Sequence, residues 1–365
     1  MNKLVSMILL SYKNYKLIWD TIDSILEQDY SNIELIVTDD GSEEFSKEEV
    51  EQYIKVNKRE NIKNVIVIAN KINQGTVRNL NTALGVMTGD FYMNIGTGDR
   101  YVHNQVVSKF QECFYNNPEK LLVCANAAMY NENLTTFLYP MMTESDRSIA
   151  KSGNAYRIYN TLAYRCILLT VATCYRKEFI KEAEAYDESY IYAEDYPTFI
   201  RMARKGIVPG FLDEIVTHHA IGGIANGNNN YDIKFTHRYY KDKCLMWKNE
   251  IRPYWKRLEE KSKIEHCKRV ENEKRNYVLK RWLLSKNPFN ILVGVIRYPQ
   301  IIMTSFKNVK LIKLLELLAL LVFGSIFGAA NDFKILEIVL FFFVGLVTLL
   351  VIQLIVTKAL DSIDL

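Results

Sequence analysis

The first hundred residues alternate short apolar runs with stretches of helical spacing. Apolar runs of five to seven residues, typical of buried strands, occupy residues 4–10, 33–37, 65–69 and 91–95. The stretches between them carry apolar residues at helical spacing, and helices are expected at residues 17–27, 43–58 and 76–86. This alternation predicts an α/β fold in which a mostly parallel sheet is flanked by helices on both faces.

The pattern becomes less regular after residue 100. We expect a helix over 102–116, a strand over 121–125, a loop-rich stretch over 130–154 and a helix over 190–206. Trp, Lys, Arg and Glu become frequent near residue 245, which indicates a domain boundary there. The expected parts are an α/β domain over 1–245, a basic helical region over 246–310 and a hairpin over 311–365.

Two long apolar segments, residues 314–330 and 335–356, lie near the C-terminus on either side of a four-residue turn. As a helix the second segment is about 33 Å long, which is enough to span the hydrocarbon core of a bilayer. Lysines flank the pair on both outer sides, which predicts a transmembrane hairpin with both ends inside. A re-entrant or interfacial hairpin, or a soluble two-helix arm, remains open because the first segment is short and carries Glu316.

Charge and cysteine content narrow the functional classes. The formal net charge of +4 over 365 residues is too small to favour nucleic-acid binding. Lys and Arg are dense between residues 241 and 313, which indicates attraction to anionic lipid headgroups or a solvated helix face. Six cysteines form no C-x-x-C pair, so no zinc or redox motif is present and a reducing cytosol is expected. Residues 1–10 lack a small-residue cleavage site and are expected to form a strand, not a signal peptide.

Polar groups follow four successive strand candidates. Tyr12 follows the first and offers a ring for stacking, while Asp39 and Asp40 follow the second and offer acceptors for a base or ribose. Arg78, near the start of the next helix, could contact the nucleobase or a phosphate. Asp99, after the fourth strand, could bind a divalent cation. A strand-end Asp is often only a cap or turn residue, so the inference depends on the combination. The set fits a nucleotide diphosphate sugar.

A second group of candidates lies between residues 190 and 230. Glu194 and Asp195 precede a helix. There Asp195 could act as a general base, and Glu194 could orient the acceptor or the loop. The alternative is an acidic pair favoured only by the helix dipole. His218 and His219 follow a late strand candidate, where they could contact the donor diphosphate or a metal ion. The alternative is a purely structural role. The glycine-rich residues 222–227 suit a mobile flap over the donor.

Several of these motifs together resemble glycosyltransferase family 2, whose GT-A fold has a Rossmann-like nucleotide-binding half. The motifs are Ser11-Tyr12-Lys13-Asn14, Asp39-Asp40-Gly41-Ser42, Asn73-Gln74-Gly75 with Arg78 and Asn79, Gly89-Asp90-Phe91-Tyr92, and Glu194-Asp195. Their order and spacing match over roughly residues 3–220. The resemblance implies that Ser11, Tyr12, Asp39, Asp40 and Arg78 line the nucleotide site. It also implies that Asp195 is the catalytic base of a direct displacement with inversion at the anomeric carbon.

One motif of that family is altered in this sequence. An Asp-x-Asp element is usual after the fourth strand, and without gaps its two carboxylates are replaced by Gly96 and Gly98. Only Asp99 remains, so a divalent cation, Mn²⁺ or Mg²⁺, would be held by one protein carboxylate and phosphate oxygens.

The combined expectation is a glycosyltransferase anchored at the cytoplasmic face of a cell membrane. Its partners would be a nucleotide-sugar donor, a lipid-linked saccharide acceptor of a surface polysaccharide such as capsule, and membrane lipids, with no nucleic acid. Transfer to polyprenyl phosphate is an alternative, although such enzymes normally keep the acidic metal element. A degenerate transferase that serves as an assembly partner is the non-enzymatic alternative, favoured by Gly96 and Gly98.

Overall fold

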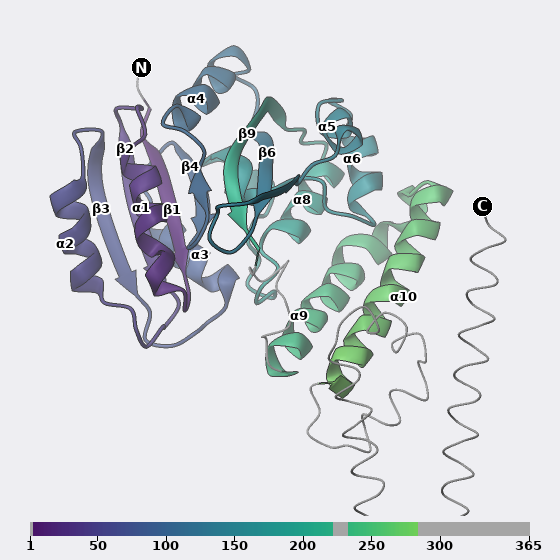
Figure 1. Cartoon of the computed structure of the whole chain (residues 1–365). Coiled ribbons are helices and arrows are strands. Elements are labelled where there is room, and N and C mark those ends of the chain that lie inside the picture. The colour runs from purple at the N-terminus through teal and green to yellow at the C-terminus, as the bar shows by residue number, and fades with distance from the viewer. Residues whose placement is uncertain (1–2, 222–232, 284–365) are drawn as a thin grey trace, which may run out of the picture. The chain divides into compact units, whose positions relative to one another are not determined.

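A single sheet forms the centre of the protein (Figure 1). The computed structural model describes residues 3–221 and 233–283, in which residues up to Glu273 form one compact unit and a second begins at Lys274. The nine strands of the sheet are β1 Val5–Ser11, β2 Ile33–Asp39, β3 Ile62–Ala69, β4 Phe91–Gly96, β5 Arg100–Tyr101, β6 Leu122–Tyr130, β7 Phe137–Pro140, β8 Thr173–Arg176 and β9 Gly210–Ala220. Their order is β3-β2-β1-β4-β8-β6-β9-β5, with β7 paired to β6.

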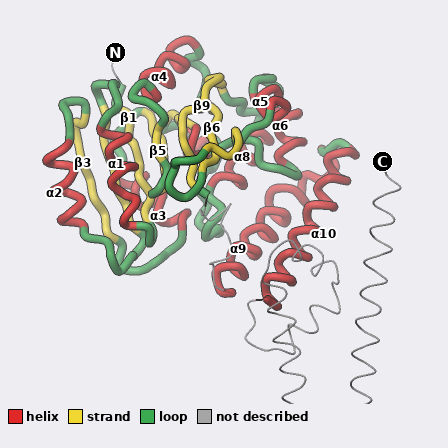
Figure 2. Tube along the Cα trace, in the orientation of Figure 1, coloured by secondary structure: helices red, strands yellow, loops and turns green. Residues whose placement is uncertain are grey.

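Helices cover both faces of this sheet, as Figure 2 shows in red around the yellow strands. The helices of the described residues are α1 Ile18–Leu26, α2 Lys47–Asn57, α3 Thr76–Val86, α4 Val106–Asn116, α5 Glu144–Ala150, α6 Ala155–Leu162, α7 Phe179–Glu182, α8 Asp195–Arg204, α9 Ile233–Met246 and α10 Glu260–Leu283. A π-helical turn, Trp247–Ile251, follows α9, and 3-10 turns span Tyr15–Leu17, Thr170–Ala172 and Arg252–Arg257.

The apolar runs read from the sequence are strands because both of their faces are buried. In β1, Met7 and Leu9 pack in one core with α1, α2 and α4, whereas Ile8 packs in the other core with α3, α6 and α8. Side chains of a strand alternate between its two faces, so a strand covered by helices on both sides needs apolar residues throughout. The prediction of helices on both faces of the sheet is therefore confirmed.

The prediction of a mostly parallel sheet is wrong, because the sheet is mixed. Strands β3, β2, β1 and β4 are parallel, but β8 runs antiparallel to both of its neighbours, β4 and β6. The short β5 and β7 are also antiparallel to their partners. Half of the strand pairs in the described residues are thus antiparallel. The parallel half, followed by a mixed half, is consistent with the GT-A fold.

Two local predictions also need correction. Residues 130–154 were expected to be loop-rich, yet they contain β7 and α5, and a further helix, α6, follows them. The helix expected over 190–206 begins only at Asp195, because the preceding backbone N–H groups bind a side chain of α9. A polar partner for an N–H group competes with the helical bond it would otherwise make.

The segment after α9 is fixed to α8 by a buried ion cluster. Glu250 accepts hydrogen bonds of 2.8 Å from both Arg201 and Arg204, and Tyr190 also donates to it at 3.4 Å. In α10, Arg269 donates at 2.6 Å to the hydroxyl of Tyr196. Residues past 245 therefore support α8 and its surroundings.

The membrane hairpin predicted over residues 311–365 lies outside the described residues, as does the glycine-rich stretch 222–227. Among residues 3–221 and 233–283, no helix has the length and apolar character that crossing a bilayer requires. The division into domains near residue 245 stays a prediction.

Candidate functional site

The carboxyl ends of the parallel strands meet at one edge of the sheet, and most of the predicted site residues lie there. Ser11 at the end of β1 is in register with Asp39 at the end of β2, and Leu10 is in register with Gly96 of β4. The N–H of Thr97 donates to the carbonyl of Leu10 at 3.0 Å. In open α/β sheets this edge is where ligands bind.

Asp39 holds the two loops of this edge together. Its carboxylate accepts hydrogen bonds from the backbone N–H of Ser42 at 2.7 Å and from the Ser42 hydroxyl at 2.8 Å. The same hydroxyl oxygen accepts the N–H of Lys13 at 2.7 Å, and Lys13 has a left-handed φ of 57°. The adjoining Tyr12 is 40% exposed, and the Lys13 ammonium lies 5.1 Å from the centre of its ring. A ring fixed at its base and open to solvent is suited to stacking.

Asp40 fastens the start of α3. Its two carboxylate oxygens accept the N–H groups of Gln74 at 2.8 Å and Gly75 at 2.9 Å, and the residue is only 4% exposed. Burial raises the pKa of Asp40 to about 6; the two N–H bonds oppose this rise, and the charge of Asp39 adds to it. Since both oxygens are used within the protein, the structure gives Asp40 a positioning role at the carboxyl edge of the sheet.

Arg78, in the first turn of α3, is available to a ligand. Its Nε lies 3.4 Å from Glu188 Oε2, and both side chains are about half exposed, 55% and 52%. Exposed ion pairs contribute little free energy because water solvates both charges well. A phosphate arriving at this edge can therefore replace Glu188 as the partner of Arg78.

The second predicted group, Glu194 and Asp195, lies at the start of α8. Burial raises the pKa of Glu194 well above its ordinary value, and the neighbouring charge of Asp195 raises it further. Burial likewise raises the pKa of Asp195, although the N–H of Tyr196 donates to its Oδ1 at 2.6 Å. Two neighbouring carboxyls, both partly buried, do not ionise together readily. A carboxylate whose pKa is raised in this way is suited to accept a proton.

The loop that precedes this pair connects it to the nucleotide edge. The carbonyl of Ile191 accepts the N–H of Val77 in α3 at 3.1 Å. Gly75 packs so closely that a Cβ there would lie 2.6 Å from the Ile191 carbonyl oxygen. Tyr192 lies close enough to Tyr12 and Asp40 for their charges to contribute to its raised pKa, for which burial is the main cause. The predicted base and the predicted nucleotide residues are therefore parts of one connected arrangement.

Sequence reasoning missed Asp242 of α9, which binds the loop from its other side. Its carboxylate accepts the N–H groups of Ile191, Tyr192 and Ala193 at 3.0, 2.6 and 3.2 Å. No motif or spacing marks it, because it lies about fifty residues after its partners and inside a helix.

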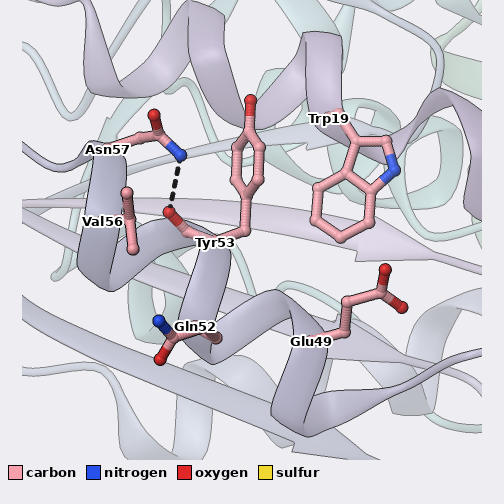
Figure 3. A pocket seen from close by; sticks show the side chains of 6 residues that line it. All are labelled: Trp19, Glu49, Gln52, Tyr53, Val56 and Asn57. Carbon is pink, nitrogen blue, oxygen red and sulfur yellow. Dashed lines mark hydrogen bonds between the residues drawn. The ribbon is translucent and has the colours of Figure 1, made fainter.

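Two hollows of the described surface do not coincide with these residues. A hollow of about 420 Å³ lies over α1 and α2, lined by Trp19, Glu49, Gln52, Tyr53, Val56 and Asn57 (Figure 3). A second, of about 280 Å³, lies beside β7 and α5. Neither contains a predicted site residue. The candidate site is therefore located by the carboxyl ends of the parallel strands and by the hydrogen bonds that connect their loops, not by a hollow.

The sequence profile of the family described as glycosyl transferase family 2 matches residues 6–187, about half of the chain. The chain belongs to glycosyltransferase family 2. An uncharacterized glycosyltransferase of Haemophilus influenzae is 24% identical over 331 residues, covering 85% of this chain and 95% of that protein. EpsJ of Bacillus subtilis, also an uncharacterized glycosyltransferase, is 28% identical, covering 58% of this chain and 59% of its own. WcaA of Escherichia coli, described as a colanic acid biosynthesis glycosyl transferase, is 26% identical, covering 58% and 71%.

Solved structures of more distant proteins resemble the chain only in part. Staphylococcus aureus TarS 1–349 in complex with UDP-GlcNAc has a TM-score of 0.47 at 15% identity, covering 80% of this chain and 87% of its own. The mannosyltransferase PcManGT of Pyrobaculum calidifontis, in complex with GDP-Man and Mn²⁺, has a TM-score of 0.48 at 14% identity, covering 90% and 81%.

The residues of this family 2 glycosyltransferase do not fit a divalent cation held by the protein at the altered Asp-x-Asp element. Gly96 and Gly98 offer no ligand, and both oxygens of Asp99 are used by β9. Asp99 Oδ2 lies 2.8 Å from His219 Nδ1, and Oδ1 accepts the N–H of Ala220 at 3.0 Å. Over residues 3–221 and 233–283, no group of three or more His, Cys, Asp or Glu is arranged to hold a metal ion. Asp99 thus ties the end of β4 to β9, and we derive no step through a cation.

The two histidines of β9 differ in surroundings. Burial lowers the pKa of His219, but the charge of Asp99 and the contact with it outweigh burial, and the pKa is raised. His218 lies against the ring of Tyr130, 4.3 Å between ring centres, and burial with the charge of Arg100 lowers its pKa. Adjacent residues of a strand face opposite sides, so only His219 joins Asp99.

The raised pKa of Asp195 leads to a pH prediction. A base must be ionised to accept a proton, so activity falls as the pH drops through the pKa of Asp195. Because burial raises that pKa, we expect the acid side of the kcat profile to lie above the range of an ordinary Asp, whose pKa is about 4. Rates measured with saturating substrates between about pH 4 and pH 8 test this. The Glu194→Gln variant should keep the same acid limb, since burial is the leading cause; a limb near pH 4 would contradict the assignment.

Proposed function

We propose that this chain is an inverting glycosyltransferase that moves a sugar from a nucleotide-sugar donor to a lipid-linked saccharide in surface-polysaccharide biosynthesis. The observation that carries the transfer chemistry is the partly buried Glu194–Asp195 pair, linked through Ile191 to the strand ends that carry Tyr12 and Asp39. The lipid-linked acceptor and a cytoplasmic-face membrane location rest on the basic stretch and the apolar segments of the sequence. The description of WcaA supports the polysaccharide context.

The proposed mechanism is a single displacement. The acceptor hydroxyl oxygen bonds to the anomeric carbon from the side opposite the donor diphosphate, and the bond from that carbon to the diphosphate oxygen breaks. Asp195 takes the hydroxyl proton, and the electron pair of the broken bond leaves with the nucleoside diphosphate. Arg78 exchanges Glu188 for the diphosphate and stabilises the negative charge that develops on it.

The remaining residues position the donor and the base. The exposed ring of Tyr12 stacks on the nucleobase, and Asp39 keeps the loop of Tyr12 in place through Ser42. Asp40 fixes the start of α3 and so the place of Arg78. Glu194, whose pKa burial and the charge of Asp195 raise, orients the acceptor through a hydrogen bond.

A screen of nucleotide sugars with the purified full chain tests the proposal. We expect slow hydrolysis of one donor without acceptor, and faster consumption with a diphosphate-linked saccharide than with polyprenyl phosphate. A chain truncated after residue 310 should keep donor hydrolysis and lose most activity on the lipid acceptor. Preference for polyprenyl phosphate would replace the proposed acceptor, and inactivity of the wild type with every donor would favour an assembly role.

A further inference from the structure

Asp242 is a buried carboxylate with an unusual set of partners. It lies in α9, is 3% exposed, and accepts three consecutive backbone N–H groups, those of Ile191, Tyr192 and Ala193. Within the described residues it contacts no basic side chain that would account for its burial as an ion pair. Burial raises its pKa, and the three N–H bonds oppose that rise by stabilising the ionised form.

Three successive N–H groups that converge on one carboxylate fix the backbone locally. Backbone N–H groups in a folded protein need an acceptor, and the carboxylate of Asp242 supplies one to all three residues of 191–193. The helix α8 starts at Asp195, two residues after the last bound residue. The place of the carboxyl pair at its start depends on where this short loop is held.

The other side of the loop is held by α3. The N–H of Val77 donates to the carbonyl of Ile191 at 3.1 Å, and Asp40 holds the N–H groups of Gln74 and Gly75 at the start of the same helix. The loop thus lies between a carboxylate of α9 on one side and α3 on the other. Each of these hydrogen bonds involves a backbone atom, so each restrains the path of the main chain itself.

The aromatic face of α9 follows the same loop. The ring of Tyr192 packs on Phe235 with 4.7 Å between ring centres. Burial is the main cause of the raised pKa of Tyr239, and the charges of Asp195 and Glu194 raise it further. The helix that carries Asp242 therefore contacts the loop through the ring packed on Tyr192 as well as through its carboxylate.

We propose that Asp242 is a positioning residue that holds Glu194 and Asp195 in place for proton transfer by binding the backbone of residues 191–193. The inference rests on the proposed function, since it assigns a role to Asp242 in that reaction. All three N–H groups reach Oδ2 of Asp242, and that of Ile191 also lies 3.2 Å from Oδ1. An amide in its place removes the negative charge that strengthens these bonds and turns an NH₂ group toward the N–H of Ile191. Small displacements of a base cost rate steeply, by as much as about 100-fold for roughly 1 Å.

The test uses the full chain with Asp242→Asn, and Asp146→Asn as a matched control. Asp146 is also a buried carboxylate that accepts a backbone N–H at a helix start, in the capping box of α5. We expect Asp242→Asn to lower kcat by about 10- to 100-fold while nucleoside diphosphate affinity stays within about twofold. Asp146→Asn should leave both unchanged. The conservative Asp242→Glu keeps two acceptor oxygens and should recover part of the rate.

Hydrogen exchange gives a readout that does not need activity. Peptides that cover residues 190–195 should exchange at least about tenfold faster in Asp242→Asn than in the wild type, and those of α1 should not change. Unchanged exchange and an unchanged kcat would overturn the inference. If the wild type turned over no donor, the proposed function would fail, and the exchange measurement would still decide whether Asp242 holds the loop.

Discussion

Asp195→Asn is expected to lower kcat for sugar transfer by about 10²- to 10⁴-fold, the range that general-base catalysis contributes. Asn has nearly the same shape and can still accept the N–H of Tyr196 that Asp195 Oδ1 accepts at 2.6 Å. It cannot take a proton from the acceptor hydroxyl at neutral pH. The melting temperature should be unchanged or higher, because the substitution removes a charge whose burial raises its pKa.

Two comparisons make this loss specific to proton transfer. Nucleoside diphosphate binding, measured by calorimetry, should be retained in Asp195→Asn because Tyr12 and Arg78 lie on other elements. Glu194→Gln should reduce the rate by less than Asp195→Asn, since Gln can still donate a hydrogen bond to the acceptor. Equal or greater loss in Glu194→Gln would move the base to Glu194.

The strand edge that carries the candidate nucleotide residues was predictable because its signals are local. Residues 33–37 are apolar except for Glu34 and Asp39 follows them closely, so the strand and the polar residue after it are read in one short window. The helix predicted over residues 76–86 matches α3 residue for residue, since Gly75 supplies a clear start with its φ of 95°. Local patterns of this kind determine the position of a residue within its helix or strand.

The reversed strand and the loop anchor were not predictable because they depend on distant residues. β8 is only four residues long, and its antiparallel direction shows only in its pairing with β4 and β6. Asp242 looks like any acidic residue of an exposed helix face until α9 packs on residues 191–193. Asp99 was predicted as a cation ligand from its place in a motif, but its oxygens are used by β9, which comes about 120 residues later.

Gly75→Ala is expected to destabilise the protein by about 2–5 kcal/mol and to lower kcat together with stability. The left-handed φ of 95° costs an alanine roughly 1–2 kcal/mol. The added Cβ would also lie 2.5 Å from Ile191 Cγ2 and 2.6 Å from the Ile191 carbonyl oxygen. Overpacking of this kind typically costs about 1–3 kcal/mol, and here the atom that must move belongs to the loop before Glu194. Thermal unfolding and kcat measured on the same preparation test both parts.

Gly85, in the same helix α3, provides the matched control. A Cβ at Gly85 meets nothing within 4 Å, and its backbone is helical, so Gly85→Ala should stabilise the protein by about 0.5–1 kcal/mol. Its kcat should not change, because the substitution leaves the contact between α3 and Ile191 intact. If Gly75→Ala unfolded at the wild-type temperature with full activity, the close packing of α3 on the loop would not hold in solution. If it lost kcat without losing stability, the loop would be displaced while the fold remained, which is the stronger sign that α3 and the base depend on each other.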